Sequence, residues 1–180
     1  MHTSCIPYAS GQREDVDVVP WNPYVLSYGS FMGLADSAAT LDANSSVDIR
    51  WRIMPDDYGD SITVYIQAVF ITQKSWMKVR HPALLAHEQG HFDITEYFAR
   101  KLRAEIWAID PMNYDSFVQS VREVYERTRV AEAAEHARYD STTNHGRTPR
   151  AQQEWLERIQ EKLSHTSRYS QPNMRILIRD

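Results

Sequence analysis

The 180-residue sequence contains a single cysteine, Cys5. One thiol cannot form an internal disulfide, so no disulfide framework holds this fold. We interpret Cys5 as a free thiol in a loose N-terminal segment, because a reactive cysteine requires an unusual electropositive environment. The fold must therefore be held by its hydrophobic core, which a chain of this length is large enough to build.

No apolar run approaches the roughly 18 residues of a membrane-spanning helix, so we expect a soluble chain that is not an integral membrane protein. A large excess of charge is also missing, since 20 Lys and Arg against 24 Asp and Glu give a net charge of -4. That balance gives no reason to expect nucleic acid or an anionic membrane as a partner. The N-terminus lacks a basic segment followed by an apolar one, so we see no signal peptide.

The order of apolar and polar residues predicts strands in the first half of the chain. Residues 47–53 alternate between the two kinds, as in a strand that is buried on one face. Residues 61–72 are rich in β-branched and aromatic side chains, and the two segments most simply pair as an antiparallel hairpin. We expect residues 1–20 to be a flexible segment, residues 21–33 a short strand or turn against the core, and residues 35–46 a loop.

The second half of the chain predicts mostly helix. Pro82 suits the first turn of a helix, and Pro111 closes the region beyond it. Residues 139–146 form a polar segment that we expect to be a loop. We expect residues 174–178 to form a final strand. The chain as a whole is expected to be one α+β domain over residues 21–180. The predicted helices span residues 81–108, 114–136 and 150–163.

The first predicted helix carries the most informative motif, His87-Glu88-Gln89-Gly90-His91, which matches H-E-x-x-H. Residues at i and i+4 of a helix lie on one face, so both imidazoles can reach a single metal ion. Glu88 lies about 100° from His87 around the axis and borders the same face, where it can act on a metal-bound water. The motif predicts a zinc site with His87 and His91 as ligands and Glu88 as general base.

A catalytic zinc ion usually keeps three protein ligands and one open position, so a third ligand must come from elsewhere. Asp93 and Glu96 project about 240° and about 180° from His87, too far round a straight helix to share the metal. We predict His145, in the polar segment, as the third ligand. Asp140 is the alternative, either as a ligand or as the acceptor that orients a ligand imidazole.

Two further features are candidates for a part in catalysis. Tyr139 could donate its phenol to the oxyanion of a tetrahedral intermediate, although an aromatic side chain that anchors the loop is an equally good interpretation. The edge of the strand over residues 61–72 is a candidate to hold an extended peptide by main-chain hydrogen bonds.

Two residues are interpreted structurally. Gly90 costs about 1 kcal/mol relative to alanine inside a helix, so we expect close packing there, most simply against a neighbouring strand. His136, at the predicted end of the second helix, is expected to be a surface or capping group.

Several segments resemble a bacterial family that is catalogued as a domain of unknown function and described as predicted secreted zinc-dependent proteases. The similarity covers roughly residues 21–163. The segments, in order, are Lys74-Ser75-Trp76, residues 85–94 (LAHEQGHFDI), Tyr139-Asp140…Thr143…His145-Gly146 and Gln153-Glu154-Trp155.

The resemblance implies a zincin-like fold, with a small antiparallel sheet packed on the H-E-x-x-H helix and two further helices. It implies one zinc ion per chain, held by His87, His91 and His145, with Glu88 as the catalytic glutamate. Members of the family often carry an export signal, so a secreted or periplasmic location is implied. The chain as given shows no such signal, which leaves a cytoplasmic location open.

We therefore expect a zinc metallopeptidase that hydrolyses a peptide or protein substrate. One alternative is a non-catalytic binding or inhibitory module stabilised by the metal, and a fourth protein ligand such as Asp140 would favour it. The other is a zinc amidase that acts on a cell-wall crosslink or another non-protein amide. Imidazole ligands suit zinc, but iron, cobalt, nickel and copper accept them as well. No feature of the sequence indicates an oligomeric state.

Overall fold

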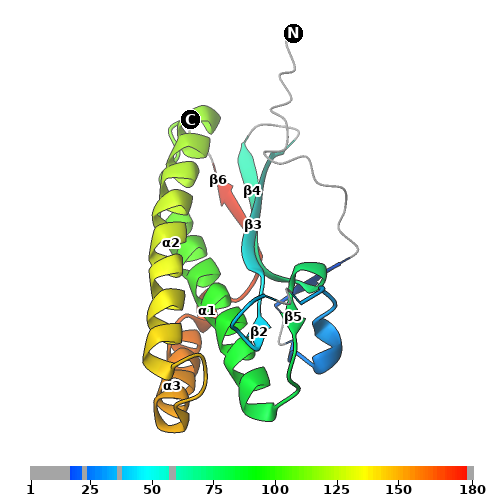
Figure 1. Cartoon of the computed structure of the whole chain (residues 1–180). Coiled ribbons are helices and arrows are strands. Elements are labelled where there is room, and N and C mark those ends of the chain that lie inside the picture. Colours follow the sequence, from blue (N-terminus) through cyan, green and yellow to red (C-terminus); the bar gives the residue numbers. More distant parts are fainter. Residues whose placement is uncertain (1–16, 22–23, 36–37, 57–59, 178–180) are drawn as a thin grey trace.

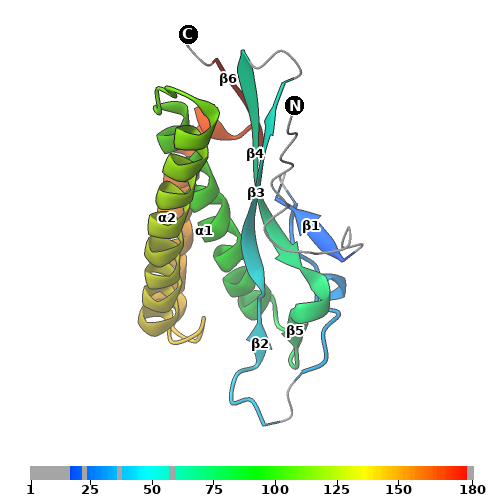
Figure 2. The same ribbon diagram turned by 90° about the horizontal axis from the view of Figure 1, so that it is seen from above.

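The computed structural model describes residues 17–21, 24–35, 38–56 and 60–177. In this part of the chain, helices cover one face of a small antiparallel sheet, and Figures 1 and 2 show the two layers from two directions. The predicted α+β class is confirmed. Cys5 and the rest of residues 1–16 lie outside the described residues.

The main sheet is built around one long central strand, β4. Strand β3 pairs antiparallel with β4 along its whole length, so the predicted hairpin is confirmed. Strands β1 and β6 share the other edge of β4, at its end and its beginning respectively. The bounds are Val18–Pro20 for β1, Val47–Pro55 for β3, Ser61–Ile71 for β4 and Asn173–Leu177 for β6.

The alternation of β4 explains how the sheet and the helices form one core. Every second side chain of β4 from position 62 to position 70 is 0% exposed. These side chains point to the face that the helices cover, because successive residues of a strand face opposite sides of the sheet. The five residues are Ile62, Val64, Ile66, Ala68 and Phe70.

Three short strands fall where the sequence predicted none. Residues 18–20 belong to β1 rather than to a flexible segment. Strand β2 (Ala43–Asn44) interrupts the predicted loop and pairs with β5 (Trp76–Met77) in a separate two-stranded sheet. A strand of two residues is too short to show a periodic pattern in the sequence. Strand β2 is recognised only by its pairing with β5, which begins 33 positions later in the chain. The chain also forms short 3-10 turns over Tyr28–Ser30, Thr72–Lys74 and Ser167–Tyr169.

Three long helices follow the sheet, as predicted. The second extends beyond its predicted end at residue 136, so most of the segment expected to be a loop is helical. Thr142 and Thr143 donate their hydroxyls to carbonyls one turn back, at 2.7 Å in both cases, and Asn144 ends the helix with a left-handed φ of 48°. The helices are α1 (Pro82–Trp107), α2 (Tyr114–Thr143) and α3 (Pro149–His165).

Helix α1 packs against the sheet on one side and against α2 and α3 on the other. A buried ionic cluster fixes it there. Glu96 Oε1 accepts hydrogen bonds from Arg100 Nε at 2.8 Å and from Arg103 Nη1 at 3.0 Å. The two guanidinium groups also donate to the carbonyl oxygens of Leu163 and Ile66, at 2.7 and 2.9 Å, which ties α1 to the end of α3 and to β4. No helix in the described part of the chain has both the length and the apolar character needed to cross a membrane.

Candidate metal centre

His87 and His91 lie one turn apart on α1, and both point toward α2. Their ring centroids are 4.9 Å apart, with the rings nearly perpendicular. His87 is almost completely buried, and the side chain of His91 is 13% exposed. The i, i+4 spacing therefore places both imidazoles on one face of one helix, as the motif predicts.

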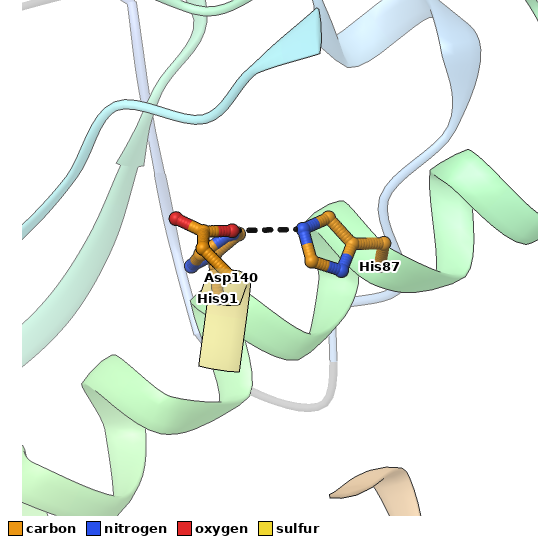
Figure 3. A group of neighbouring side chains, drawn as sticks. All are labelled: His87, His91 and Asp140. Atoms are coloured by element: carbon orange, nitrogen blue, oxygen red, sulfur yellow. Dashed lines mark hydrogen bonds and ion pairs between the residues drawn. The ribbon is translucent and has the colours of Figure 1, made fainter. Parts of the chain in front are cut away.

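The third member of the group is Asp140, from α2. Its Oδ1 lies 3.1 Å from Nε2 of His87 and 3.0 Å from Nε2 of His91, and Figure 3 shows the three side chains together. The ligand atoms of the three residues all lie within 4.8 Å of one another, so this group could hold a metal ion.

The spacing and the donor set of this group fit zinc. Ligand atoms around a tetrahedral ion with bonds of about 2.0 Å are about 3.3 Å apart, close to the separations observed here. Two imidazoles and one carboxylate are a combination that catalytic zinc sites use. Asp140 was the alternative to His145 in the sequence analysis, and Asp140 is the residue that joins the two histidines in this group.

His145 lies at the rim of the site, just after α2. Its Nδ1 is 3.4 Å from Asp140 Oδ1, but it is not part of the three-residue group, and its side chain is 43% exposed. His145 and Gly146 both have positive φ, 53° and 76°, so the chain turns sharply back over α1. The role of His145 as a metal ligand stays a prediction.

Gly146 is required by its contact with His87. A Cβ at position 146 would lie 2.9 Å from the Cβ of His87, and the positive φ is itself a conformation that favours glycine. This contact holds the turn that carries His145 close to the ring of His87.

A closed set of hydrogen bonds orients the His87 ring. Tyr139 donates its hydroxyl to the His87 carbonyl at 3.2 Å, so the phenol oxygen can only accept from Gln152 Nε2, at 2.5 Å. The other end of that amide, Gln152 Oε1, lies 3.0 Å from His87 Nδ1 and accepts its hydrogen. His87 Nδ1 therefore carries a hydrogen, which leaves Nε2 as the nitrogen that faces Asp140 and the metal position.

Tyr139 is fully buried beneath the site rather than exposed to it. Its ring stacks on His87, with centroids 4.6 Å apart, and its oxygen lies against Gly90. The close packing expected at Gly90 is real, but the neighbour is helix α2 and not a strand. With its hydroxyl already bonded, Tyr139 fits the anchoring interpretation better than the oxyanion one.

A cavity of about 390 Å³ opens beside the three grouped residues. Glu88 lines it and is 4% exposed. Burial raises the pKa of Glu88, while the nearby Ser45 hydroxyl and His87 lower it. Ser45 Oγ is itself buried and makes no hydrogen bond of standard geometry with any residue that the structure describes. A carboxylate of raised pKa beside the metal position is suited to accept a proton.

Two members of the group, His91 and Asp140, have the charge states that a metal requires of its ligands. Burial lowers the pKa of His91 to about 4, against the opposing effect of the hydrogen bond with Asp140. Burial raises the pKa of Asp140, but the hydrogen bonds with His87 and His91 outweigh it and hold that pKa well below its usual range. Near neutral pH, His91 is therefore neutral and Asp140 is ionised.

The cavity is bounded by β2 and the first residue of β3, over positions 43–47, and not by β4. Strand β4 is paired on both edges, so the predicted use of its edge for a peptide is wrong. Strand β3 is an edge strand of the main sheet, and β1 and β6 lie at the opposite edge. The backbone that runs beside the metal position is therefore that of residues 43–47, in β2 and at the start of β3, and not that of β4.

A family model matches residues 35–146, and its family is described as a bacterial protein of unknown function (DUF922). The chain belongs to the DUF922 family. The matched part of this DUF922 protein contains the whole three-residue group together with Glu88 and His145. No curated protein and no solved structure matches the chain.

Two residues of this DUF922 protein lie at the site against or beyond what its sequence predicted, namely His136 and Gln152. His136 Nδ1 lies 2.9 Å from His91 Nδ1, so it is not a surface or capping group. His136 lies four residues before Asp140, so the two share one face of α2. That relation indicates a place at the site only if the second helix is predicted to continue beyond residue 136. Gln152 carries no such signal, because its role depends on how α3 packs. Asp93 is buried, and its Oδ1 accepts from Trp21 Nε1 at 2.8 Å.

Proposed function

We propose that this DUF922 protein is a zinc-dependent hydrolase of peptide bonds, with His87, His91 and Asp140 as ligands. One observation carries the proposal: three donor atoms converge beside an open cavity that Glu88 also lines. A structural zinc site is normally closed by four protein ligands, whereas a catalytic site keeps a position open. Three protein ligands beside a cavity fit a catalytic site.

A zinc ion bound there would polarise the scissile carbonyl and lower the pKa of water in its open position. Glu88 takes a proton from the attacking water and later delivers it to the leaving amine. The raised pKa of Glu88 supports this role, since it makes the carboxylate a better proton acceptor at neutral pH. Gln152 holds the His87 ring in place throughout, because its amide oxygen accepts from Nδ1.

The extended backbone over positions 43–47 supports a peptide as the substrate. A peptide that lies along an exposed strand can form main-chain hydrogen bonds with it, and the side chains of both then alternate. Ala43 and Val47 are small enough to leave room for substrate side chains in the cavity. A compact non-protein amide would gain little from such an edge, so we place the zinc amidase second.

A second candidate function has its own observation. The 3.4 Å between His145 Nδ1 and Asp140 Oδ1 is a separation that two ligands of one ion also show. If His145 completes a set of four, the site is closed and the protein is a metal-stabilised module without turnover.

Metal content and hydrolysis, measured on the same purified proteins, separate these functions. We expect elemental mass spectrometry to find one zinc per chain in wild type and in His145→Ala, and almost none in Asp140→Ala. Glu88→Gln should keep its zinc and lose at least about 10²-fold in the cleavage of quenched fluorescent peptides. Hydrolysis by Glu88→Gln at the wild-type rate would overturn the proposed mechanism. Loss of zinc from His145→Ala would favour the closed site.

A further inference from the structure

A chain of polar side chains leads from His91 into α2, and the proposed hydrolysis uses none of them. His136 lies next to His91, with the two Nδ1 atoms 2.9 Å apart and the ring centroids 5.0 Å apart. On the other side of the His136 ring, Nε2 lies 3.3 Å from Thr95 Oγ1 and 3.5 Å from Glu132 Oε1.

Glu132 is buried, and only one of its two carboxylate oxygens accepts a hydrogen bond of standard geometry from a described residue. It is 1% exposed, and its Oε2 accepts from Arg129 Nη1 at 2.6 Å. Its Oε1 is buried and has no hydrogen-bond partner of standard geometry among the described residues. A buried carboxylate oxygen needs a donor, and His136 Nε2 is the nitrogen that faces it. Glu132 thus directs one of its two oxygens at the His136 ring.

The neighbours of His136 determine which of its nitrogens carries the hydrogen. Thr95 donates its hydroxyl to the His91 carbonyl at 3.2 Å, so Thr95 Oγ1 can only accept from His136. The Glu132 carboxylate, which accepts from Arg129 through its other oxygen, is also an acceptor here. Since both groups near Nε2 are acceptors, a neutral His136 has its hydrogen on Nε2 and a lone pair on Nδ1.

That arrangement is passed on to His91. The lone pair of His136 Nδ1 faces His91 Nδ1, which therefore carries the hydrogen and donates it. His91 Nε2 is then left with a free lone pair, 3.0 Å from Asp140 Oδ1 and directed at the metal position. In the metal-free protein, Asp140 Oδ1 competes for the hydrogen of His91 because it can accept from Nε2. A metal that binds both atoms removes that competition and leaves the hydrogen on Nδ1, facing His136.

We propose that Glu132 and His136 are positioning residues that hold His91 in the tautomer able to bind the metal. His136 does for His91 what Gln152 does for His87, from a different helix. Partners of this kind typically contribute 10- to 100-fold to metal affinity. The proposal rests on the proposed function in one respect, that His91 is a zinc ligand. It does not depend on what the protein hydrolyses.

Zinc affinity, measured by competition with a chromophoric chelator, tests this proposal. We expect His136→Leu to weaken zinc binding by about 10- to 100-fold, because the leucine cannot accept from His91. His136→Asn should recover most of the loss, since an asparagine oxygen can take the place of Nδ1. A matched control is His165→Leu, which removes an exposed histidine from the last turn of α3 and should bind zinc as wild type does. Unfolding of each metal-free protein shows whether the variants are folded.

The tautomer itself gives a second readout that needs no metal. Nitrogen-15 NMR of metal-free Asp140→Ala, which lacks the competing acceptor at Nε2, should show the His91 hydrogen on Nδ1, and Glu132→Gln in that background should raise the share of the other tautomer. This measurement decides the matter if His136→Leu does not fold. An unchanged tautomer in Glu132→Gln, or wild-type zinc affinity in a folded His136→Leu, would overturn the proposal. His136→Asn binding as weakly as His136→Leu would overturn it as well.

The same measurements keep this proposal distinct from the proposed function. A wild type that binds zinc but cleaves no peptide would overturn the peptidase and leave the roles of Glu132 and His136 to be decided by the variants. A wild type that binds no zinc would overturn both.

Discussion

The backbone of Gly90 lies directly against the phenol of Tyr139. A Cβ at position 90 would stand 2.3 Å from the phenol oxygen and 2.8 Å from the ring carbon that carries it. This contact sets the separation of α1 and α2 just beneath His87 and His91. Asp140 follows Tyr139 in the chain, so the same contact also fixes the distance of the carboxylate from the two imidazoles.

Gly90→Ala is expected to destabilise the protein and to weaken zinc binding together. Overpacking of a close contact costs about 1–3 kcal/mol, of which the better helix propensity of alanine returns about 1 kcal/mol. Urea denaturation of the metal-free protein measures the first effect and zinc titration the second. In a Tyr139→Phe background the nearest atom is gone, so the same substitution should cost less. Equal costs in the two backgrounds would contradict the contact.

Tyr139→Phe distinguishes an anchoring side chain from a catalytic one. Loss of its hydroxyl leaves Gln152 Nε2 and the His87 carbonyl without their partner, and we expect a loss of about 1–3 kcal/mol in the free energy of unfolding. The kcat of zinc-loaded protein should fall by less than about 10-fold. A donor to the oxyanion would instead cost about 10²- to 10³-fold in kcat, with stability nearly unchanged.

The metal-free protein should lose stability as the pH falls from about 6.5 to about 4. Burial lowers the pKa of His91 to about 4 from its usual 6.5, so in this range the unfolded chain binds a proton that the folded chain does not. Unfolding is therefore favoured as the pH drops, by about 3 kcal/mol over the whole range. Urea denaturation in the presence of a chelator measures it. His91→Asn should show a smaller dependence on pH, and an identical slope would show that His91 is not its source.

Glu96→Gln is expected to be strongly destabilising, because it leaves Arg100 and Arg103 buried without a counter-charge. Removing one partner of a buried ion pair costs about 3–5 kcal/mol. Glu105→Gln is the matched control on the same helix. Its partner Arg127 is exposed, so that change should cost less than about 1 kcal/mol. Similar midpoints of urea denaturation for the two variants would contradict this account.

The parts of the fold and site that the sequence predicted are those with a local pattern. The H-E-x-x-H spacing places His87 and His91 on one face of any helix, whatever surrounds it. The alternation of residues 47–53, the composition of residues 61–72 and the proline in the first turn of α1 are likewise local signals. These features were confirmed for that reason.

Features set by distant contacts were predicted less well. Residues 140–143 are polar and favour turns, so Asp140 was expected in a loop. They are helical because Tyr139 is buried against α1 and the threonine hydroxyls bond to carbonyls of the previous turn. Once Asp140 lies on the helix, it meets both histidines, and this geometry places it ahead of His145 in the donor group.

The recurring DUF922 segment is smaller than the unit that folds. It ends at residue 146, before α3 begins, so the amide that orients His87 comes from outside it. The core members Trp155, Ile159 and Leu163 lie outside it too, as do both strands that cover the second edge of β4. A polypeptide cut to the family boundaries would carry every metal donor but not an autonomous core. The interior of this chain therefore depends on residues that precede and follow the matched segment.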